Sequence, residues 1–192
     1  MKLKIITTPN PILKRKSKKI TKIDKKVIKF IKNLEDTLLK KKDPPGIGLS
    51  APQVGKNWSV FSVQLPQENI SGRKDLKDHQ LILKTYLNPQ IITASKKLTL
   101  SGTKAKPFLE GCLSIPLIYA PVYRHEWIKL KYSTINDLRS TIQKTEKFSG
   151  FKARVIQHEL DHLDGILFTD RSIKQKLPLY KEEQEKLVKI NL

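Results

Sequence analysis

Two histidines stand four residues apart in the stretch Gln-His-Glu-Leu-Asp-His at 157–162, and a glutamate directly follows the first. On an α-helix this spacing turns through about 400°, so His158 and His162 project about 40° apart, one turn above the other. Two imidazoles placed in this way can bind one metal ion, whereas Glu159 points about a quarter turn away and can hydrogen-bond a water on the metal. The pattern predicts a helix over about 151–163 and a metal-dependent hydrolase. The alternative is a surface helix with two chance histidines.

A third metal ligand decides the class of hydrolase. A zinc protease would need a His or Glu downstream, but no histidine follows His162, and the glutamates at 182–185 lie in a Lys-rich segment typical of a solvent-exposed helix face. Upstream, Cys112 lies in Glu-Gly-Cys-Leu-Ser-Ile-Pro at 110–116. A thiolate and two imidazoles leave one open position on a catalytic metal. The other interpretations of Cys112 are a small buried core residue and a catalytic thiol.

The segment Gly-Ile-Gly-Leu-Ser-Ala-Pro-Gln-Val-Gly at 46–55 is rich in glycine. It lacks the Gly-Lys-Ser/Thr of a phosphate-binding loop, and its glycine spacing and Pro52 do not fit a dinucleotide-binding turn. Two interpretations are equally favoured from the residues alone. The segment is a simple turn between a helix and a strand, or a backbone that lies close to an extended ligand with the Gln53 amide as a donor.

The length and composition fit one water-soluble domain over 1–192, with 38% hydrophobic residues. No apolar run approaches the roughly 20 residues needed to cross a bilayer, and the basic start Met-Lys-Leu-Lys lacks the features of a secretory signal. We therefore expect a cytoplasmic protein with no membrane partner. The single cysteine excludes an intrachain disulfide and suits a reducing compartment.

The formal net charge of +20 raises the question of nucleic-acid binding. Lysines greatly outnumber arginines and spread along the whole chain, and neither arginines nor aromatic residues cluster. A composition bias explains this charge better than sequence-specific nucleic-acid recognition, which relies on arginine forks and aromatic platforms. Weak steering towards ribosomal RNA remains a second interpretation.

Hydrophobic periodicity predicts an α+β fold. Apolar residues at helical spacing indicate a first helix over 24–41, with Asp24 as its N-cap, and a C-terminal helix of mixed charge over about 179–190. The polar stretch 66–80 is predicted to be a loop, and 95–107 a loop or a twisted edge. Alternating apolar residues predict strands over 58–65, 81–87, 90–94, 127–132 and 141–147.

Three segments, taken together and in this order, resemble the peptide deformylase family: Gly46–Gly55, Glu110–Ser114 and Gln157–Leu163. They match the family's Gly-x-Gly-x-(Ala/Ser)-Ala-Pro-Gln-x-Gly loop, its Glu-Gly-Cys-Leu-Ser segment and its Gln-His-Glu-x-Asp-His-Leu helix. The likeness covers about residues 3–170 and includes the N-terminal turn at 9–13. It leaves a tail at about 173–192, where we place the C-terminal helix.

The chain departs from the family pattern outside these segments. Asn10 stands where the family usually has Asp, His125 is an unusual neighbour of Arg124, and the stretches 66–80 and 95–107 are long and Lys-rich. These departures concern loop shape and peptide contacts and leave the chemistry unchanged.

The resemblance implies antiparallel sheets packed around a central metal-binding helix, with an N-terminal and a C-terminal helix. It implies one divalent metal ion per chain, bound by Cys112, His158 and His162, with Fe(II) as the native ion and Zn, Ni or Co as substitutes in purified protein. The implied reaction is hydrolysis of the formyl group from formyl-methionine at the start of nascent polypeptides, with release of formate.

The same resemblance implies roles for further residues. Glu159 would accept a proton from water and deliver it to the leaving amine. The Gln53 side chain and the Leu113 backbone N–H would stabilise the oxyanion. The peptide would lie extended along the Ile47–Gly48 and Gly111 backbones, and its methionine would enter an apolar pocket near Ile47, Leu113, Phe151 and Val155.

Two other functions compete with this one. A zincin-type metallopeptidase would cut internal peptide bonds and need no formyl group. A non-catalytic, basic module that binds RNA or the ribosome would have no reason to keep Gln53, Cys112, Glu159 and both histidines. A further hypothesis retains the enzyme and docks its C-terminal helix on the ribosome near the exit tunnel, where the substrate is supplied.

Overall fold

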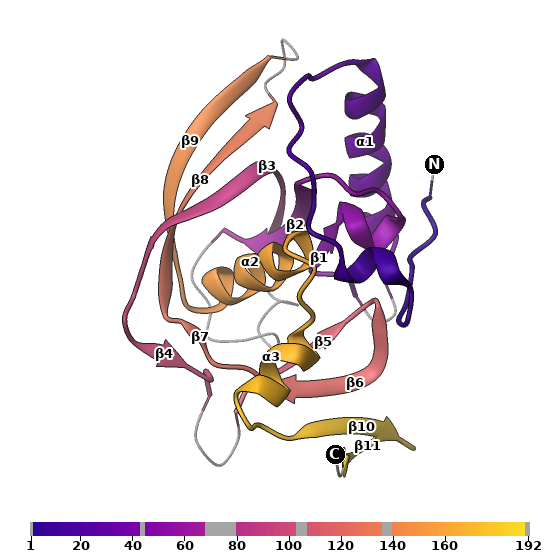
Figure 1. Cartoon of the computed structure of the whole chain (residues 1–192), viewed down its shortest axis with the longest axis vertical. Helices are drawn as coiled ribbons and strands as arrows, with labels where there is room; N and C mark the ends of the chain where they lie inside the picture. The colour runs from indigo at the N-terminus through magenta and orange to yellow at the C-terminus, as the bar shows by residue number, and fades with distance from the viewer. Residues whose placement is uncertain (1, 43–44, 68–79, 103–106, 136–139, 191–192) are drawn as a thin grey trace.

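The computed structural model describes residues 2–42, 45–67, 80–102, 107–135 and 140–190. Its helices and strands are mixed along the chain, which confirms the predicted α+β class (Figure 1). In chain order the elements are η1 (Pro11–Lys14), α1 (Lys25–Leu39), β1 (Gly48–Ser50), η2 (Ala51–Val54), β2 (Val60–Pro66), β3 (Leu81–Ala94), β4 (Leu98–Thr99), β5 (Leu109–Cys112), β6 (Ile115–Pro121), β7 (Arg124–His125), β8 (Trp127–Ile135), β9 (Thr141–Ser149), α2 (Gly150–Leu163), α3 (Phe168–Lys174), β10 (Leu179–Glu183) and β11 (Lys186–Ile190).

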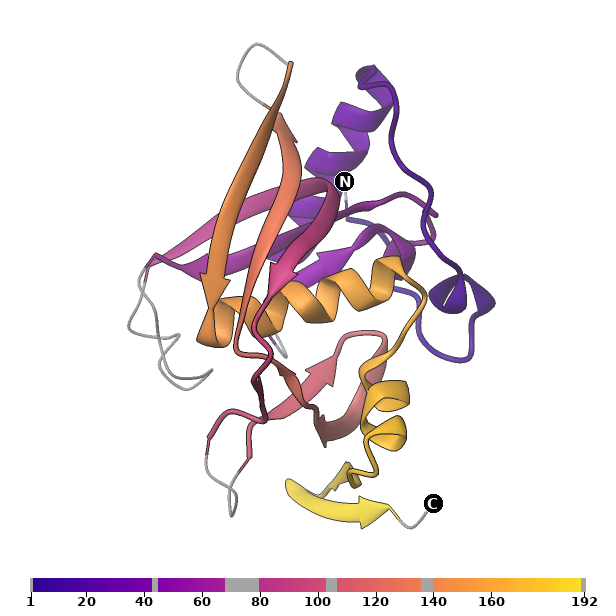
Figure 2. The same ribbon diagram turned by 60° about the vertical axis from the view of Figure 1, so that its left-hand side comes forward.

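The strands form antiparallel sheets on either side of helix α2. The larger sheet has the order β1-β2-β3-β8-β9, and the second has the order β11-β10-β6-β5. A short pair, β4 and β7, completes the described strands. Figure 1 and Figure 2 show α2 lying between the two main sheets, as expected for a helix that presents different side chains to each. Helix α1 contacts β1, β2 and β3.

Helix α1 begins after Asp24, whose side chain accepts a hydrogen bond from the Val27 N–H at 2.8 Å. An Asp at this position satisfies an N–H that the first turn leaves without a partner inside the helix. The buried face has side chains at helical spacing, and it packs in one hydrophobic cluster with Leu49 of β1 and Val60 of β2. The helix predicted over 24–41 is confirmed.

Helix α2 carries both predicted histidine ligands and confirms the helix predicted over 151–163. Its apolar side chains pack in a cluster with residues of β2, β3, β8 and β9. Because these side chains bury one face of α2 against the larger sheet, His158 and His162 turn towards β5. The buried apolar residues of this face are Phe151, Ala153, Ile156 and Leu163.

The two strands predicted over 81–87 and 90–94 form one bent strand, β3. Asn88 lies at the bend with a φ of 49°, and its side chain bonds both the N–H and the C=O of Ile20 at 2.8 Å. The pairing of β3 with β8 shifts register between Leu87 and Gln90. The Asn-Pro pair therefore acts as a bulge that bends the strand without ending it.

The C-terminal helix predicted over 179–190 is wrong, because these residues form the hairpin β10–β11. Gln184 and Glu185 both have positive φ, 48° and 64°, which fits a tight two-residue turn. Strand β10 also pairs with β6, so β6 supplies backbone partners that a helix would not use. This pairing outweighs the helix propensity of the Glu- and Lys-rich segment. The helix nearest the C-terminus is α3.

Strands β5 and β6 lie in a region where the sequence patterns predicted none. Their pairing shifts register between Gly111 and Cys112. This irregularity places Cys112 at the end of β5, facing α2. The stretch 95–107 contains β4, which agrees with a twisted edge, and most of the predicted loop over 66–80 lies outside the described residues.

Candidate metal centre

Three side chains meet where β5 faces α2. Cys112, His158 and His162 each offer one ligand atom, and these atoms lie within 4.8 Å of one another. The Cys112 Sγ atom is 3.2 Å from His162 Nε2. Ligands about 2.0–2.3 Å from a shared tetrahedral ion lie about 3.5 Å apart, so this geometry suits one ion.

The hydrogen bonds around Cys112, His158 and His162 leave one ring nitrogen of His158 available to bind a metal ion. His158 Nδ1 lies 2.9 Å from Glu110 Oε2. A carboxylate accepts, so Nδ1 carries the hydrogen and the Nε2 lone pair is left for an ion. Within the described ranges, the buried Glu159 Oε2 and His162 Nδ1 have no hydrogen-bond partner. A set of two nitrogens and one sulfur fits a divalent ion such as Fe(II) or Zn.

Glu159 is 3% exposed and lies against β1. A Cβ atom at Gly48 would overlap its carboxylate, so a glycine is required at that position. Burial raises the pKa of Glu159 to about 7, against the opposing charges of His158 and Arg124. A carboxyl with a pKa near 7 can accept and return a proton at neutral pH.

The Gln53 side chain is held in place by Ser50. Its Oε1 atom accepts hydrogen bonds from the Ser50 N–H at 2.8 Å and from the Ser50 hydroxyl at 2.9 Å. The Nε2 amide then points at Cys112 Sγ, 3.4 Å away. The 46–55 segment is thus more than a turn, because it brings an amide donor and the backbone of Gly48 to the metal centre.

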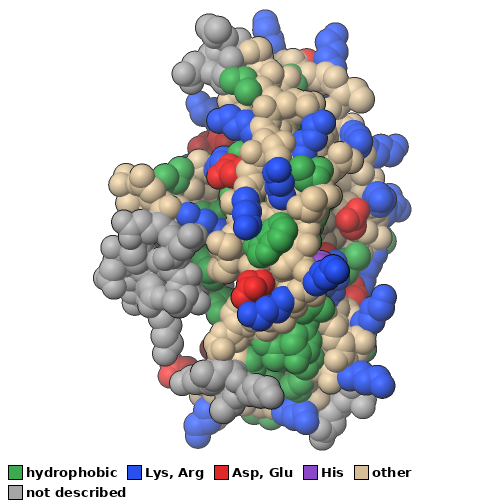
Figure 3. Space-filling view, turned by 90° about the vertical axis from the view of Figure 1, so that its left-hand side faces the viewer, with side chains coloured by type: hydrophobic (Ala, Val, Ile, Leu, Met, Phe, Trp, Pro, Cys, Tyr) green, Lys and Arg blue, Asp and Glu red, His purple; other side chains and the backbone are tan. Residues whose placement is uncertain are grey.

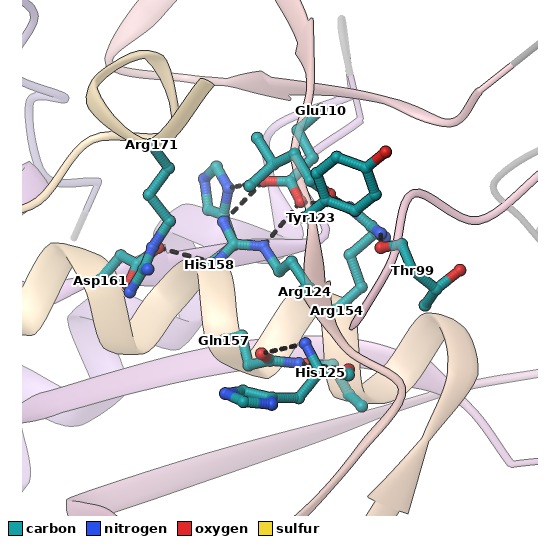
Figure 4. Close-up of polar contacts among 12 residues, drawn as sticks. Thr99, Glu110, Tyr123, Arg124, His125, Arg154, Gln157, His158, Asp161 and Arg171 are labelled. Atoms are coloured by element: carbon teal, nitrogen blue, oxygen red, sulfur yellow. Dashed lines mark hydrogen bonds and ion pairs between the residues drawn. The ribbon is translucent and has the colours of Figure 1, made fainter. Parts of the chain in front are cut away.

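A buried network of charged side chains contacts the metal centre through Glu110 and His158 (Figure 4). The Arg124 guanidinium donates to both oxygens of Glu110 at 2.7 Å and to Asp161 at 2.7 Å. Arg154 donates to Glu110 Oε1 at 2.7 Å, and Arg171 of α3 pairs with Asp161. The network links β5, β7, α2 and α3, and it ends on the His158 ring through Glu110.

The network sets the charge of Glu110. Burial alone would raise its pKa, but the adjacent Arg124, with a smaller contribution from His158, holds the pKa of Glu110 well below its usual range. The same contacts raise the pKa of Arg124 above its ordinary value, although burial opposes this. Both groups therefore stay charged at neutral pH.

Replacing Glu110 by Gln is expected to lower the free energy of unfolding by about 3–5 kcal/mol, because Arg124 and Arg154 would lose a buried counter-charge. Urea unfolding monitored by circular dichroism measures this. Glu183→Gln, which breaks an ion pair between side chains that are about half exposed, is the matched control and should change stability by less than about 1 kcal/mol. Equal effects of the two variants would contradict a structural role for the network.

The predicted substrate-binding residues lie around one cavity of about 470 Å³. Cys112, His158 and Glu159 line it as well, so the cavity opens onto the metal centre. Phe108 also contributes to its wall, in edge contact with Phe151. The predicted residues that line the cavity are Ile47, Gly48, Gln53, Gly111, Leu113, Phe151 and Val155.

The buried arginines were missed at the sequence level, although a signal existed. The chain has 38 Lys and Arg residues, of which only six are Arg. Three of these six, Arg124, Arg154 and Arg171, join the network. Arg is better suited than Lys to buried pairs because its planar group donates several hydrogen bonds at once. The scarcity of Arg in this Lys-rich chain was therefore a signal that some of these positions could be structural.

The departures from the family pattern are accommodated away from the metal. Asn10 caps η1 by accepting a hydrogen bond from the Ile12 N–H at 3.1 Å, which an Asp would also do. The backbone of His125 exchanges two hydrogen bonds with the Gln157 side chain (Figure 4). The His125 ring nitrogen Nδ1 lies 2.6 Å from the Ser95 carbonyl oxygen. His125 therefore ties β7 to α2 and is not among the ligands.

Comparison with known proteins agrees with this geometry. A family model of polypeptide deformylases matches residues 2–177. The peptide deformylase of Desulfotalea psychrophila is 35% identical over 184 residues, which are 96% of this chain and 95% of that protein. Peptide deformylase 1B, chloroplastic/mitochondrial, of Arabidopsis thaliana is 40% identical, and the alignment covers 97% of this chain and 60% of that protein.

Solved structures give the same result. The Met-Ala-Ser-bound crystal structure of a class I type b peptide deformylase from Acinetobacter baumannii superimposes with a TM-score of 0.70 at 28% identity. The superposition covers 89% of this chain and 98% of that one. With the match over residues 2–177, these likenesses show that the chain belongs to the polypeptide deformylase family.

Proposed function

We propose that this protein removes the formyl group from the N-terminal formyl-methionine of newly synthesised polypeptides and releases formate. The observation that carries the proposal is the placement of Cys112, His158 and His162 beside the buried Glu159, at a cavity lined largely by apolar residues. This arrangement provides a metal, a base and a binding pocket together. Family membership favours this function over a zincin-type peptidase.

The reaction requires proton transfer and stabilisation of negative charge. Cys112, His158 and His162 would hold a divalent ion, which when bound would act as a Lewis acid and lower the pKa of water. Glu159 accepts the proton of the attacking water and passes it to the amine as the formyl C–N bond breaks. The Gln53 amide and the Leu113 N–H face the developing oxyanion, and each such donor contributes about 3–4 kcal/mol. The residues that hold the peptide are Ile47, Gly48, Gly111, Phe151 and Val155.

The native ion is proposed to be Fe(II), with Zn, Ni or Co as substitutes. The soft thiolate of Cys112 beside two imidazoles is compatible with each of these ions. Iron with a thiolate is open to oxidation. Formate release by anaerobic Fe(II) protein and by aerobic Zn protein should therefore differ, with the Fe(II) protein losing activity in air. Equal oxygen resistance of the two forms would contradict the predicted oxidation of an iron–thiolate site, and the metal content of protein purified without oxygen identifies the native ion.

Metal binding is expected to release protons at neutral pH. Burial disfavours a charged His158, but its contacts with Cys112 and Glu110 outweigh burial and raise the pKa of His158 well above its ordinary value. The ring must lose its second proton to ligate. Zinc affinity should therefore rise with pH, and titration calorimetry in buffers of different ionisation enthalpy should show about one proton or more released per ion. Release of none would contradict this ligand set.

The formylated and unformylated forms of one peptide distinguish a deformylase from a zincin-type peptidase. Formyl-Met-Ala-Ser should lose its formyl group and yield formate and Met-Ala-Ser, whereas Met-Ala-Ser itself should remain intact. Mass spectrometry of the products identifies which bond breaks. Cleavage of internal peptide bonds in either substrate would favour the zincin-type peptidase.

The cellular location of the protein and its contact with the ribosome are proposed only in general terms. No helix within the described ranges is long and apolar enough to cross a membrane. A cytoplasmic location stays a prediction, since a relative is named chloroplastic/mitochondrial. A C-terminal docking helix loses its basis, because 179–190 form a hairpin. Figure 3 shows Lys and Arg spread over one face without a single patch, so on this face a weak attraction to RNA is favoured over one docking site.

A further inference from the structure

The cavity at the metal centre has a wall that the proposed reaction does not use. Tyr119 of β6 and Glu182 of β10 line it, together with Cys112 and Glu159. Figure 2 shows the β10–β11 hairpin beyond β6, where it extends the second sheet away from α2. Residue 182 lies past residue 177, where the family match ends. This part of the wall therefore belongs to the segment that forms a hairpin where a solvated helix was expected.

The strand geometry of β10 turns Glu182 towards the cavity. Neighbouring side chains of a strand point to opposite faces. Lys181 and Glu183 pair with each other at 2.9 Å, and both are about half exposed. Glu182 lies on the other face, where its Oε2 accepts a hydrogen bond from the Tyr119 hydroxyl at 2.9 Å. The Tyr119 ring in turn lies against Gly111, so Glu182 is held at a fixed place in the wall.

Within the part of the chain that the structure describes, Glu182 and Glu110 differ in their charged partners. Glu110 also lines the cavity, but Arg124, Arg154 and His158 all pair with it. Among the described residues, no Lys or Arg forms an ion pair with Glu182. The hydroxyl of Tyr119 donates to its carboxylate and orients it. Among the described residues that line the cavity, Glu182 is thus the one carboxylate outside the metal centre, and Lys41 is a cation on the same lining.

We propose that Glu182 gives the enzyme a preference for formyl peptides that carry a lysine or arginine side chain shortly after the methionine. This inference rests on the proposed deformylase function. A peptide whose methionine occupies the apolar pocket must extend past other parts of the same wall. A cationic side chain reaching Glu182 gains a charge-assisted hydrogen bond. The +20 charge of the chain repels such peptides at long range, and Glu182 offsets this repulsion locally.

The expected effect is moderate and depends on salt. Partly exposed ion pairs change an equilibrium by up to about fivefold, and salt screens them. We therefore expect the ratio of kcat/KM for a lysine peptide to that for its glutamine counterpart to fall about three- to fivefold in Glu182→Gln. In 0.5 M salt this difference between the variant and the wild type should largely disappear.

The test uses three pairs of formyl-Met tetrapeptides, with Lys or Gln at the second, third or fourth position and Ala or Ser elsewhere. Formate release is measured for wild type, Glu182→Gln, Glu182→Lys and Glu183→Gln. Glu183→Gln is the matched control, because it removes the same charge from the same strand on the opposite face. The wild type and this control should show the same Lys/Gln ratio. Glu182→Lys should lower the ratio further.

Two outcomes overturn the proposal. The first is a Lys/Gln ratio that is unchanged by Glu182→Gln at all three positions. The second is an equal loss in Glu183→Gln, which would assign the effect to overall charge. Turnover of neutral formyl-Met-Ala-Ser by the wild type separates these results from a failure of the proposed function, since a protein that releases no formate from it is not a deformylase.

Discussion

Replacing Glu159 by Gln should leave the metal bound and lower kcat by about 10²–10⁴-fold, the usual contribution of a positioned acid–base group. Gln has nearly the same shape, so the packing against Gly48 is kept while the proton acceptor is lost. The KM for formyl-Met-Ala-Ser should change little, because Glu159 does not hold the peptide. Formate release and metal content are measured on the same sample.

The control for this variant is Glu126→Gln, which removes a carboxylate from an exposed ion pair with Lys97. It should release formate at the wild-type rate. If Glu159→Gln also did so with its metal bound, Glu159 would not be the proton carrier. If the Glu159→Gln variant lost its metal, the role of Glu159 would be to position the metal ligands.

Replacing Cys112 by Ala should abolish metal retention. Two imidazoles would remain, and the affinity should fall by more than the 10–100-fold seen when a partner of a ligand is removed. The Cys112 side chain is half-buried and small, so the fold should survive, and circular dichroism checks this. Metal per chain is measured after dialysis against a weak chelator. Retention of one ion per chain would exclude Cys112 as a ligand.

The parts of the fold that were predictable are those encoded locally. Helix α2 follows from the spacing of its apolar residues and of His158 and His162, all within one segment. Helix α1 follows in the same way from its buried face and its Asp24 cap. The candidate ligand Cys112 is distant in sequence from α2. The residues alone left a core residue and a catalytic thiol as other interpretations of it, and the resemblance to a family implied its place in the ligand set.

The parts that were missed depend on partners far along the chain. The hairpin at 179–190 forms because β6 offers an open edge, which no property of the segment itself reveals. The buried network joins Glu110 to Arg154 across 44 residues and to Arg124 across 14. Pairing of charges in three dimensions leaves no periodic pattern. The consequence for the site is direct, because the hairpin carries Glu182 into the cavity wall.

Metal-free protein titrated with Fe(II) under anaerobic conditions tests the central claim most directly, with formate release from formyl-Met-Ala-Ser as the signal. The metal-free chain should release no formate above background. Activity should then rise in proportion to added Fe(II) and reach a plateau at about one ion per chain, as one site formed by Cys112, His158 and His162 requires. Full activity before any metal is added would contradict a metal-dependent deformylase.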